Sequence, residues 1–286
     1  MAFQIITDTG CDLPENMVAE LGIKVVPLSL LYKGQTYTDY PESFIKELYA
    51  GMRAGENGST SAINPDGWER AMEPYLQEGK DVLVLAFSSG LSTTYQSAVI
   101  AAEELKEKYP ERDVRVVDTL CASLGQGLLV WYACQKQSEG LSLEETANWV
   151  EENKKHLCHF FTPDDLMHLK RGGRVSAATA VAGTLLQIKP LLHVDDAGKL
   201  ISIGKARGRK AAIKAIGDKL GELGLSGENE TVFISHGDCE EDAQALAEMV
   251  KEKYGVKTVV IYYVGAVIGA HSGPGTLAFF FLGEHR

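Results

Sequence analysis

Hydroxyl side chains follow one strongly apolar stretch of the sequence. Residues 81–87 predict a strand buried on both faces, and Ser-Ser-Gly-Leu-Ser-Thr-Thr-Tyr follows at residues 88–95. Open α/β sheets bind ligands at the carboxyl ends of their strands, where the next helix offers free N–H groups. Hydroxyl groups at this position can donate hydrogen bonds to an anion. Serine is also a common helix cap, so the sequence supports both interpretations.

Two other segments offer similar groups. Ser59-Thr60-Ser61 precedes a helix expected to begin near Pro65, where it can cap that helix or donate to a ligand. Residues 269–275, Gly-Ala-His-Ser-Gly-Pro-Gly, predict a loop that carries His271. Such loops often hold binding residues, although a lone histidine is structural about as often.

A carboxylate lies in the tripeptide Asp8-Thr9-Gly10, which aspartic proteases also contain. Those enzymes need two such carboxylates that share a proton, and the sequence holds no second copy. We therefore expect Asp8 to cap a strand-to-helix turn.

A serine hydrolase is a minor alternative. Its nucleophile would be Ser89 or Ser92, with His271 as the base and Asp8 or Asp118 to orient that base. The Gly-x-Ser-x-Gly turn of such enzymes is incomplete, because alanine stands at residue 86. No catalytic residue is therefore assigned.

Nucleotide, metal and cofactor sites are not predicted. The glycine-containing basic segments at residues 170–174 and 205–210 lack the order of a phosphate-binding P-loop, and no Gly-x-Gly-x-x-Gly occurs. Four candidate metal ligands have a spacing that matches no standard zinc site: His156, Cys158, His159 and His168.

The charge is unevenly distributed. The net charge is −11, which argues against nucleic acid as a partner. Residues 170–214 nevertheless contain ten basic and two acidic side chains, so this segment carries +8 and the rest of the chain −19. A basic segment on an acidic protein indicates either a local anionic partner or a solvated basic surface.

The N-terminal half alternates apolar strands with helices, which predicts a parallel sheet covered by helices on both faces. One helix is expected to open at residues 12–14 with Asp12 as its cap. The other elements expected here are strands 3–7, 23–31, 81–87 and 114–117 and helices 41–52, 65–77, 91–108 and 123–138.

The C-terminal half predicts a mixed α+β domain. Residues 195–198, Asp-Asp-Ala-Gly, are typical of a hairpin turn between strands 188–194 and 199–206. We place the two domains at residues 1–159 and 160–286. The other elements expected here are strands 159–162, 231–236 and 258–264 and helices 163–170, 176–186, 209–223 and 240–254.

Composition indicates an ordinary cytoplasmic protein. Of 286 residues, 45% are hydrophobic and 23% charged, and no apolar run reaches the roughly 18 residues of a membrane span. The first residues lack the basic and apolar regions of a secretory signal. The five cysteines form no Cys-x-x-Cys pair, which favours reduced thiols.

Over essentially its whole length the sequence resembles the DegV family, the fatty-acid-binding components of bacterial fatty acid kinase. Many motifs occur in the family's order. They are residues 6–9 and 12–14, 25–28, 60–61, 88–98, Asp118, 123–127, 169–176, 189–192, Lys205, Arg207 and 267–275.

The resemblance implies a two-domain DegV-like fold with a long-chain fatty acid between the domains. It implies a lipid-binding protein of bacterial phospholipid metabolism, which presents the carboxylate to a separate ATP-dependent kinase subunit. Transient contact with a membrane or an acyltransferase is also consistent with it. The alternative is a passive fatty-acid carrier or sensor.

The resemblance also implies site residues. Carboxylate contacts map to Thr60, Ser92 and His271, and Ser89 lies in the same motif as Ser92. Contacts with the kinase subunit map to Arg174 and Arg207, which both fall in the basic segment.

This chain departs from the family's pattern at two places. Thr93 replaces a glycine and adds a hydroxyl near the carboxylate, and the loop after Ser61 is longer and more apolar before Pro65.

A fatty-acid tail favours a closed apolar tunnel. Burying each methylene contributes roughly 0.8 kcal/mol, so a 16-carbon tail offers about 11 kcal/mol before the costs of association. Candidate lining residues are Val181, Leu185, Leu186, Ile188, Leu191, Leu192, Val264, Val267, Ile268 and Phe279–Phe281.

Overall fold

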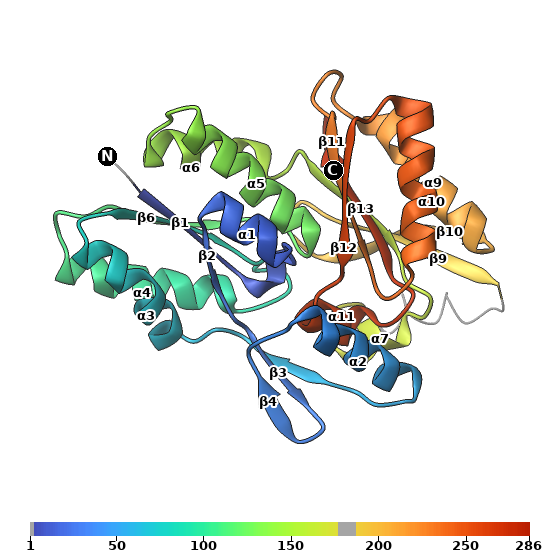
Figure 1. Ribbon diagram of the computed structural model, residues 1–286, viewed down its shortest axis with the longest axis horizontal. Helices are drawn as coiled ribbons and strands as arrows, with labels where there is room; N and C mark the ends of the chain where they lie inside the picture. Colours follow the sequence, from blue (N-terminus) through green and yellow to red (C-terminus); the bar gives the residue numbers. More distant parts are fainter. Residues whose placement is uncertain (1–2, 177–186) are drawn as a thin grey trace.

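The apolar runs of the N-terminal half form a parallel sheet. The computed structural model describes residues 3–176 and 187–286, and within them four strands pair in the order β2-β1-β6-β7 (Figure 1). All three pairings are parallel, and every residue of β6 is buried. The strands are β1 Phe3–Asp8, β2 Lys24–Val26, β6 Asp81–Ala86 and β7 Val114–Asp118.

Helices cover both faces of this sheet, as predicted. Val82 and Val84 pack on one side with α3 and α4, whereas Leu83 and Leu85 pack on the other with α5 and α6. The short α1 packs on the α5 side, and η1 Thr9–Cys11 follows β1. The helices are α1 Glu15–Leu21, α3 Pro65–Gln77, α4 Thr94–Lys108, α5 Leu124–Ser138 and α6 Leu143–Asn153.

A mixed sheet organises the C-terminal half. Its order over the described residues is β10-β9-β8-β13-β11-β12, and only β11 and β12 pair in parallel. Helices α9 and α10 pack on one face. The elements are β8 Leu157–Thr162, α7 Met167–Arg171, β9 Ile188–Val194, β10 Leu200–Arg207, α9 Arg209–Leu223, β11 Thr231–His236, α10 Glu240–Tyr254, β12 Thr258–Tyr263, α11 Ala266–Ser272 and β13 Leu277–Leu282.

A third, small sheet lies beside α11. Its antiparallel strands have the order β4-β3-β5, and α2 packs against them (Figure 1). The Tyr49 hydroxyl of α2 donates to the Val264 carbonyl oxygen at 2.7 Å, just before α11. The bounds are β3 Ser29–Tyr32, β4 Gln35–Tyr37, α2 Glu42–Arg53 and β5 Ser59–Ser61.

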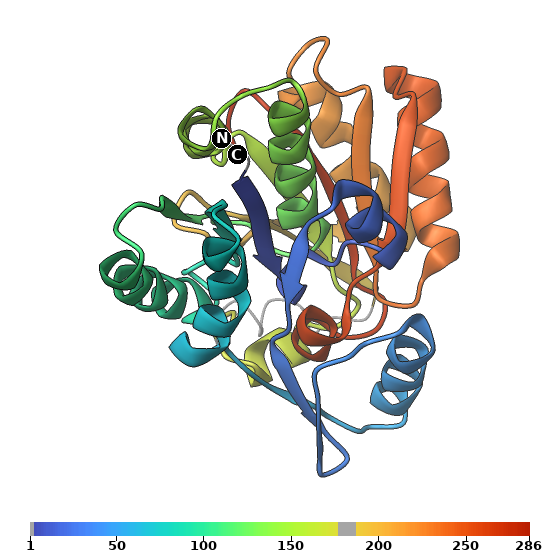
Figure 2. The same ribbon diagram turned by 60° about the vertical axis from the view of Figure 1, so that its left-hand side comes forward.

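Helix α5 joins the two large sheets. It lies between them in both views (Figures 1 and 2), and one hydrophobic core contains residues of both sheets around it. A Cβ at Gly125 would lie 2.2 Å from His159 Nε2 of β8, and a Cβ at Gly127 would lie 2.7 Å from the Cys11 carbonyl oxygen. Glycine is therefore required on two sides of α5, because β8 and the turn after β1 each approach its backbone closely.

Several sequence predictions are corrected here. Residues 23–31 form not one strand but β2 and β3, which belong to different sheets. Between them the Leu28 N–H donates to the Thr9 hydroxyl at 3.0 Å, so the chain turns away from the parallel sheet. Helix α6 was not predicted, although Ser142 and Glu145 form a capping box at its start. The helix expected at residues 176–186 lies, apart from its first residue, outside the described residues.

The domain division at residue 159 remains a prediction. It falls within β8, whose residues pair with β9 and β13. We propose a boundary before Leu157, because it keeps this strand in one domain.

Asp12 does not cap α1 as expected. It is buried with a φ of 52°, and the N-cap of α1 is Pro14. Its Oδ2 accepts a hydrogen bond from the Ser123 hydroxyl at 2.6 Å, and that hydroxyl lies 3.0 Å from the Ser235 hydroxyl of β11. Burial raises the pKa of Asp12 to about 7. A polar cluster thus connects the two domains beside α5.

We predict that Asp12→Asn gains stability relative to the wild type as the pH rises from 5 to 7. The folded protein keeps a proton on Asp12 in this range, whereas the unfolded chain has lost it above its ordinary pKa of about 4. The Asp12 contribution to stability is therefore largest below about pH 4 and declines up to pH 7. Urea unfolding at each pH should show the variant-minus-wild-type difference rising by about 1–3 kcal/mol. A constant or falling difference would contradict this.

Candidate functional site

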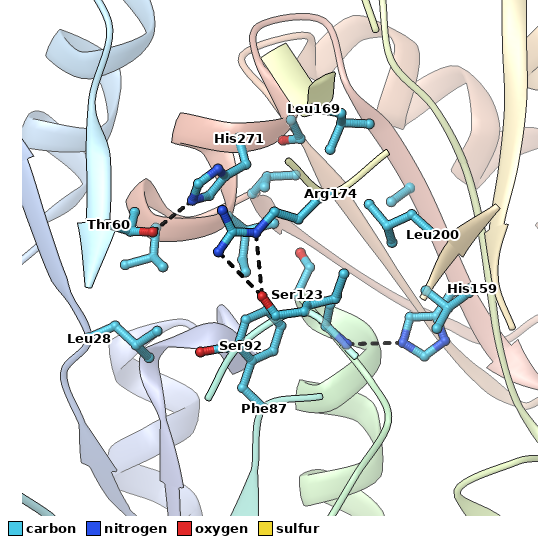
Figure 3. A pocket seen from close by; sticks show the side chains of 18 of the residues that line it. Leu28, Thr60, Phe87, Ser92, Ser123, His159, Leu169, Arg174, Leu200 and His271 are labelled. Carbon is cyan, nitrogen blue, oxygen red and sulfur yellow. Dashed lines mark hydrogen bonds between the residues drawn. The ribbon is translucent and has the colours of Figure 1, made fainter. Parts of the chain in front are cut away.

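A cavity of about 480 Å³ lies between the two domains, which is within the usual range of small-molecule sites (Figure 3). Its walls come from the β6–α4 connection and the start of α5 on one side, and from β8, β13, α7 and α11 on the other. Most of the lining is apolar. These residues are Leu28, Ala62, Phe87, Leu91, Ala122, Phe161, Leu169, Val194, Leu200, Val264, Val267, Ile268, Ala278 and Phe280.

The apolar lining was predicted only in part. Val264, Val267, Ile268 and Phe280 line the cavity. Phe279 and Phe281 instead pack with α9 and α10, because neighbouring strand residues face opposite sides of a sheet. Ile188, Leu191 and Leu192 are likewise not among the lining residues. Val181, Leu185 and Leu186 lie outside the described residues.

One part of the cavity is polar and contains the three residues expected to bind a carboxylate. Thr60 Oγ1 lies 2.7 Å from His271 Nε2, and Figure 3 shows Ser92 below this pair with Arg174 between them. Thr60 is positioned by the pairing of β5 with Leu30 of β3. The loop predicted around His271 is wrong, since His271 lies in the last turn of α11. A helix fixes the imidazole more firmly than a loop would.

His271 is held in its neutral form. Burial, and to a smaller extent the positive charge of Arg174, lower its pKa to about 4. The backbone of Gly172 packs against the ring, because a Cβ at this position would lie 2.2 Å from His271 Nδ1. A neutral imidazole can donate one hydrogen bond and accept one, so it suits a polar ligand group beside Thr60.

Ser92 both lines the cavity and caps α4. Its Oγ accepts from the Thr94 N–H at 3.2 Å and lies 2.8 Å from Thr94 Oγ1. Ser89 and Thr93 also line the cavity, and Thr93 is the N-cap residue of α4. The positive end of a 15-residue helix dipole therefore faces this polar region. The capping interpretation of the 88–95 segment is therefore supported, and donation to an anion remains a prediction.

The two arginines expected to contact a partner occupy different surroundings. Arg174 lines the cavity, and its Nε and Nη2 donate to the Leu91 carbonyl oxygen at 3.4 and 3.3 Å. Arg207 is exposed at the end of β10 and does not line the cavity. Arg174 thus lines the same cavity as Thr60, Ser92 and His271, whereas Arg207 does not.

The triad of the hydrolase alternative is not assembled within the described residues. Asp8 accepts from the N–H groups of Gly10 and Phe87, so it caps the turn after β1 as predicted. Asp118 accepts from the N–H groups of Ser89 and Leu120. Within residues 3–176 and 187–286, neither Ser89 nor Ser92 forms a hydrogen bond with His271.

A second polar region of the cavity was not predicted. His159 Nδ1 lies 2.9 Å from the Leu157 carbonyl oxygen, and its Nε2 accepts from the Ala122 N–H at 3.3 Å. Burial lowers the pKa of His159 well below its ordinary value, so the ring stays neutral. Ser123 and Ser272 also line the cavity. The sequence offered only a weak signal, the place of His159 in an apolar strand.

Metal ligands and membrane-spanning segments were searched in residues 3–176 and 187–286. No group of three or more His, Cys, Asp or Glu side chains there could hold a metal ion. None of the helices in the same ranges has the length and hydropathy to cross a membrane.

Comparison with known proteins gives consistent matches over the whole chain. A model of the DegV family, described as uncharacterised proteins, matches residues 2–284. A DegV domain-containing protein of Clostridium perfringens is 49% identical over 286 residues, which cover 99% of this chain and 98% of that protein.

Solved structures are similarly close. A DegV family protein from Thermus thermophilus, described by its fatty acid binding, has a TM-score of 0.88 and 34% identity over 99% of this chain and 100% of that one. A hypothetical protein from Thermotoga maritima, whose structure is said to reveal a fatty acid binding function, has a TM-score of 0.86 and 32% identity over 99% of each chain. The predicted fold class, a parallel-sheet domain followed by a mixed-sheet domain, is confirmed.

We predict that Gly172→Ala displaces His271 and breaks its hydrogen bond with Thr60. The new methyl group would lie 2.2 Å from His271 Nδ1. NMR of the imidazole nitrogens should show the change. Gly173→Ala is the matched control, since its Cβ would meet nothing within 4 Å, although its φ of 75° costs about 1 kcal/mol of stability. Identical imidazole spectra in wild type and Gly172→Ala would contradict the prediction.

Proposed function

This chain belongs to the DegV family, and we propose that it binds one long-chain fatty acid in the cavity between its two domains. The observation that carries the proposal is a single cavity that joins a mostly apolar lining to a polar group made of Thr60, Ser92 and His271. Fatty acids have this same division between a hydrocarbon tail and a hydrogen-bonding head group.

The lining suits the tail. Burial of apolar surface stabilises a complex by about 25 cal/mol per Å², so each buried methylene group adds roughly 0.8 kcal/mol. Phe87, Phe161 and Phe280 supply large apolar surfaces, and Val267 and Ile268 add branched side chains from α11. Water in such a cavity has few hydrogen-bond partners, which favours its replacement by a hydrocarbon chain.

The polar group suits the head. A buried carboxylate needs hydrogen bonds, since leaving it unpaired is costly. Thr60 and Ser92 bring hydroxyl donors, and the Thr60 hydroxyl is free to donate to the ligand when neutral His271 donates its Nε2–H to Thr60 Oγ1. Ser89 and Thr93 add hydroxyl groups on the same wall. We propose these five residues as the head-group site.

We further propose that the bound carboxylate is phosphorylated by a separate ATP-dependent kinase subunit in bacterial phospholipid metabolism. The chain's own sequence has no P-loop, so ATP would come with the partner. A groove of about 620 Å³ lies directly beside the cavity and shares Leu91, Arg174 and Leu200 with it. Arg207 is exposed and lies outside this groove, and we propose that it contacts the kinase subunit. The protein would act in the cytoplasm, with transient contact to a membrane or acyltransferase for exchange.

We predict that protein denatured directly after purification releases a fatty acid, identified by mass spectrometry. Thr60→Val should weaken palmitate binding about 2- to 10-fold, because one hydrogen bond to the head group is lost. Thr36→Val, on exposed β4 of the same small sheet, is the control and should bind normally. Absence of any acyl ligand, together with no uptake of added palmitate, would refute the proposal.

We predict that phosphate passes from ATP to bound palmitate only when a bacterial fatty acid kinase subunit is added. Arg207→Gln should slow this transfer about 10-fold and leave palmitate affinity unchanged, because Arg207 lies outside the cavity. Lys210→Gln, also exposed, is the control. If palmitate binds normally but no phosphate reaches it even with the kinase subunit present, the protein is instead a passive carrier or sensor.

A further inference from the structure

The end of the cavity away from the head-group site is closed by a row of side chains on the mixed sheet. Phe280 of β13 pairs with His159 of β8, and the register of β8 with β9 places Val194 on the other side of His159. All three side chains line the cavity. Figure 3 shows His159 on the side of the cavity opposite to Thr60. A ligand whose head group lies at Thr60 therefore points its other end toward this row.

The cavity does not continue along the sheet beyond this row. The residues of β13 that face the cavity alternate, so Ala278 and Phe280 both line it. The next residue in the alternation, Leu282, pairs with Leu157 of β8. Both of these leucines are buried in the core that the two domains share, and neither is among the lining residues. His159 thus belongs to the last row of the sheet that a bound chain can reach.

The imidazole of His159 is fixed in place. Its Nδ1 lies 2.9 Å from the Leu157 carbonyl oxygen, and its Nε2 accepts from the Ala122 N–H at 3.3 Å. The backbone of α5 packs against the ring, because a Cβ at Gly125 would lie 2.2 Å from Nε2. The Phe280 ring is nearly perpendicular to it, with the ring centroids 5.2 Å apart. Contacts on so many sides make His159 a rigid part of the cavity wall.

Both nitrogens of this ring are used by the backbone. Neutral imidazole has one donor and one acceptor, and the contacts with Leu157 and Ala122 use both of them. The ring therefore offers a ligand no unused polar group, which suits contact with a hydrocarbon chain. A leucine of similar size would leave the buried Ala122 N–H without its acceptor, and that loss is costly.

We infer that His159 is the wall at which the tail of the ligand ends, and that it sets the longest acyl chain that the cavity accepts. This inference deepens the proposed binding of a fatty acid and rests on it. A chain that already reaches His159 gains nothing from further methylene groups, because a closely packed wall has no space for them. Longer acids must bend or displace side chains, so they bind more weakly.

The test lets myristate, palmitate, stearate and arachidate compete for protein freed of bound lipid, with native mass spectrometry as the readout. His159→Ala removes the ring and leaves room for about two further methylene groups. The variant should therefore raise the ratio of bound arachidate to bound palmitate about 10-fold over the wild type.

A matched control is available on the same sheet. His193 of β9 stacks on Phe160 on the opposite face, among the side chains that pack with α9 and α10, and does not line the cavity. His193→Ala removes the same ring, and its arachidate-to-palmitate ratio should equal that of the wild type.

A second variant covers the case in which His159→Ala does not fold. His159→Asn has a smaller side chain and keeps an N–H donor for the Leu157 carbonyl oxygen. It should shift the ratio in the same direction by a smaller amount. The melting temperature without lipid shows that each variant is folded before the competition is measured.

Three results would overturn the inference. An unchanged arachidate-to-palmitate ratio in the folded His159 variants would show that the tail does not end at this ring. An equal loss of all four acids would show that His159 only supports the fold. If the wild type took up none of the four acids, the proposed function itself would fail, and the inference with it.

Discussion

The packing of α5 between two sheets is the interaction on which the rest of the structure depends. The N-terminal parallel sheet and the C-terminal mixed sheet both bury apolar side chains against this helix, and they share one hydrophobic core. Gly125 and Gly127 make the close approach feasible, because a methyl group at either position would collide with β8 or with the turn after β1. The relative position of the domains is therefore fixed by core packing and not by a linker.

The cavity follows from this arrangement. At the start of α5 the two sheets separate, and the space between them is closed by α7, α11 and the β6–α4 connection. Thr60 and His271 are 211 positions apart in the sequence, yet they lie within hydrogen-bond distance, because β5 and α11 pack against each other at this opening. A site of this kind forms only when both domains have docked on α5.

Local signals in the sequence predicted where helices and strands lie better than they predicted which of these elements pack together. The apolar run of β6, the turn at residues 195–198 and α9 were predicted because each is specified by neighbouring residues. Residues 23–31 were assigned to one strand because no local signal shows that Leu28 bonds to Thr9. The helix around His271 was missed since its glycines and proline favour a turn, although packing against α2, α7 and β5 stabilises it. The positions of Arg174 and His159 in the cavity wall depend on contacts across domains, which spacing along the chain does not encode.

Burial between the two domains has two opposite effects at the polar end of the cavity. It removes water, which allows a hydrocarbon chain to be held and lowers the pKa of His271 until the ring is neutral. It also deprives Arg174 of the solvent that would otherwise screen its charge, and the described residues offer it only carbonyl oxygens. A neutral ligand would satisfy the first condition but not the second. The proposed ligand, a fatty acid with an apolar chain and a single negative charge, would satisfy both conditions.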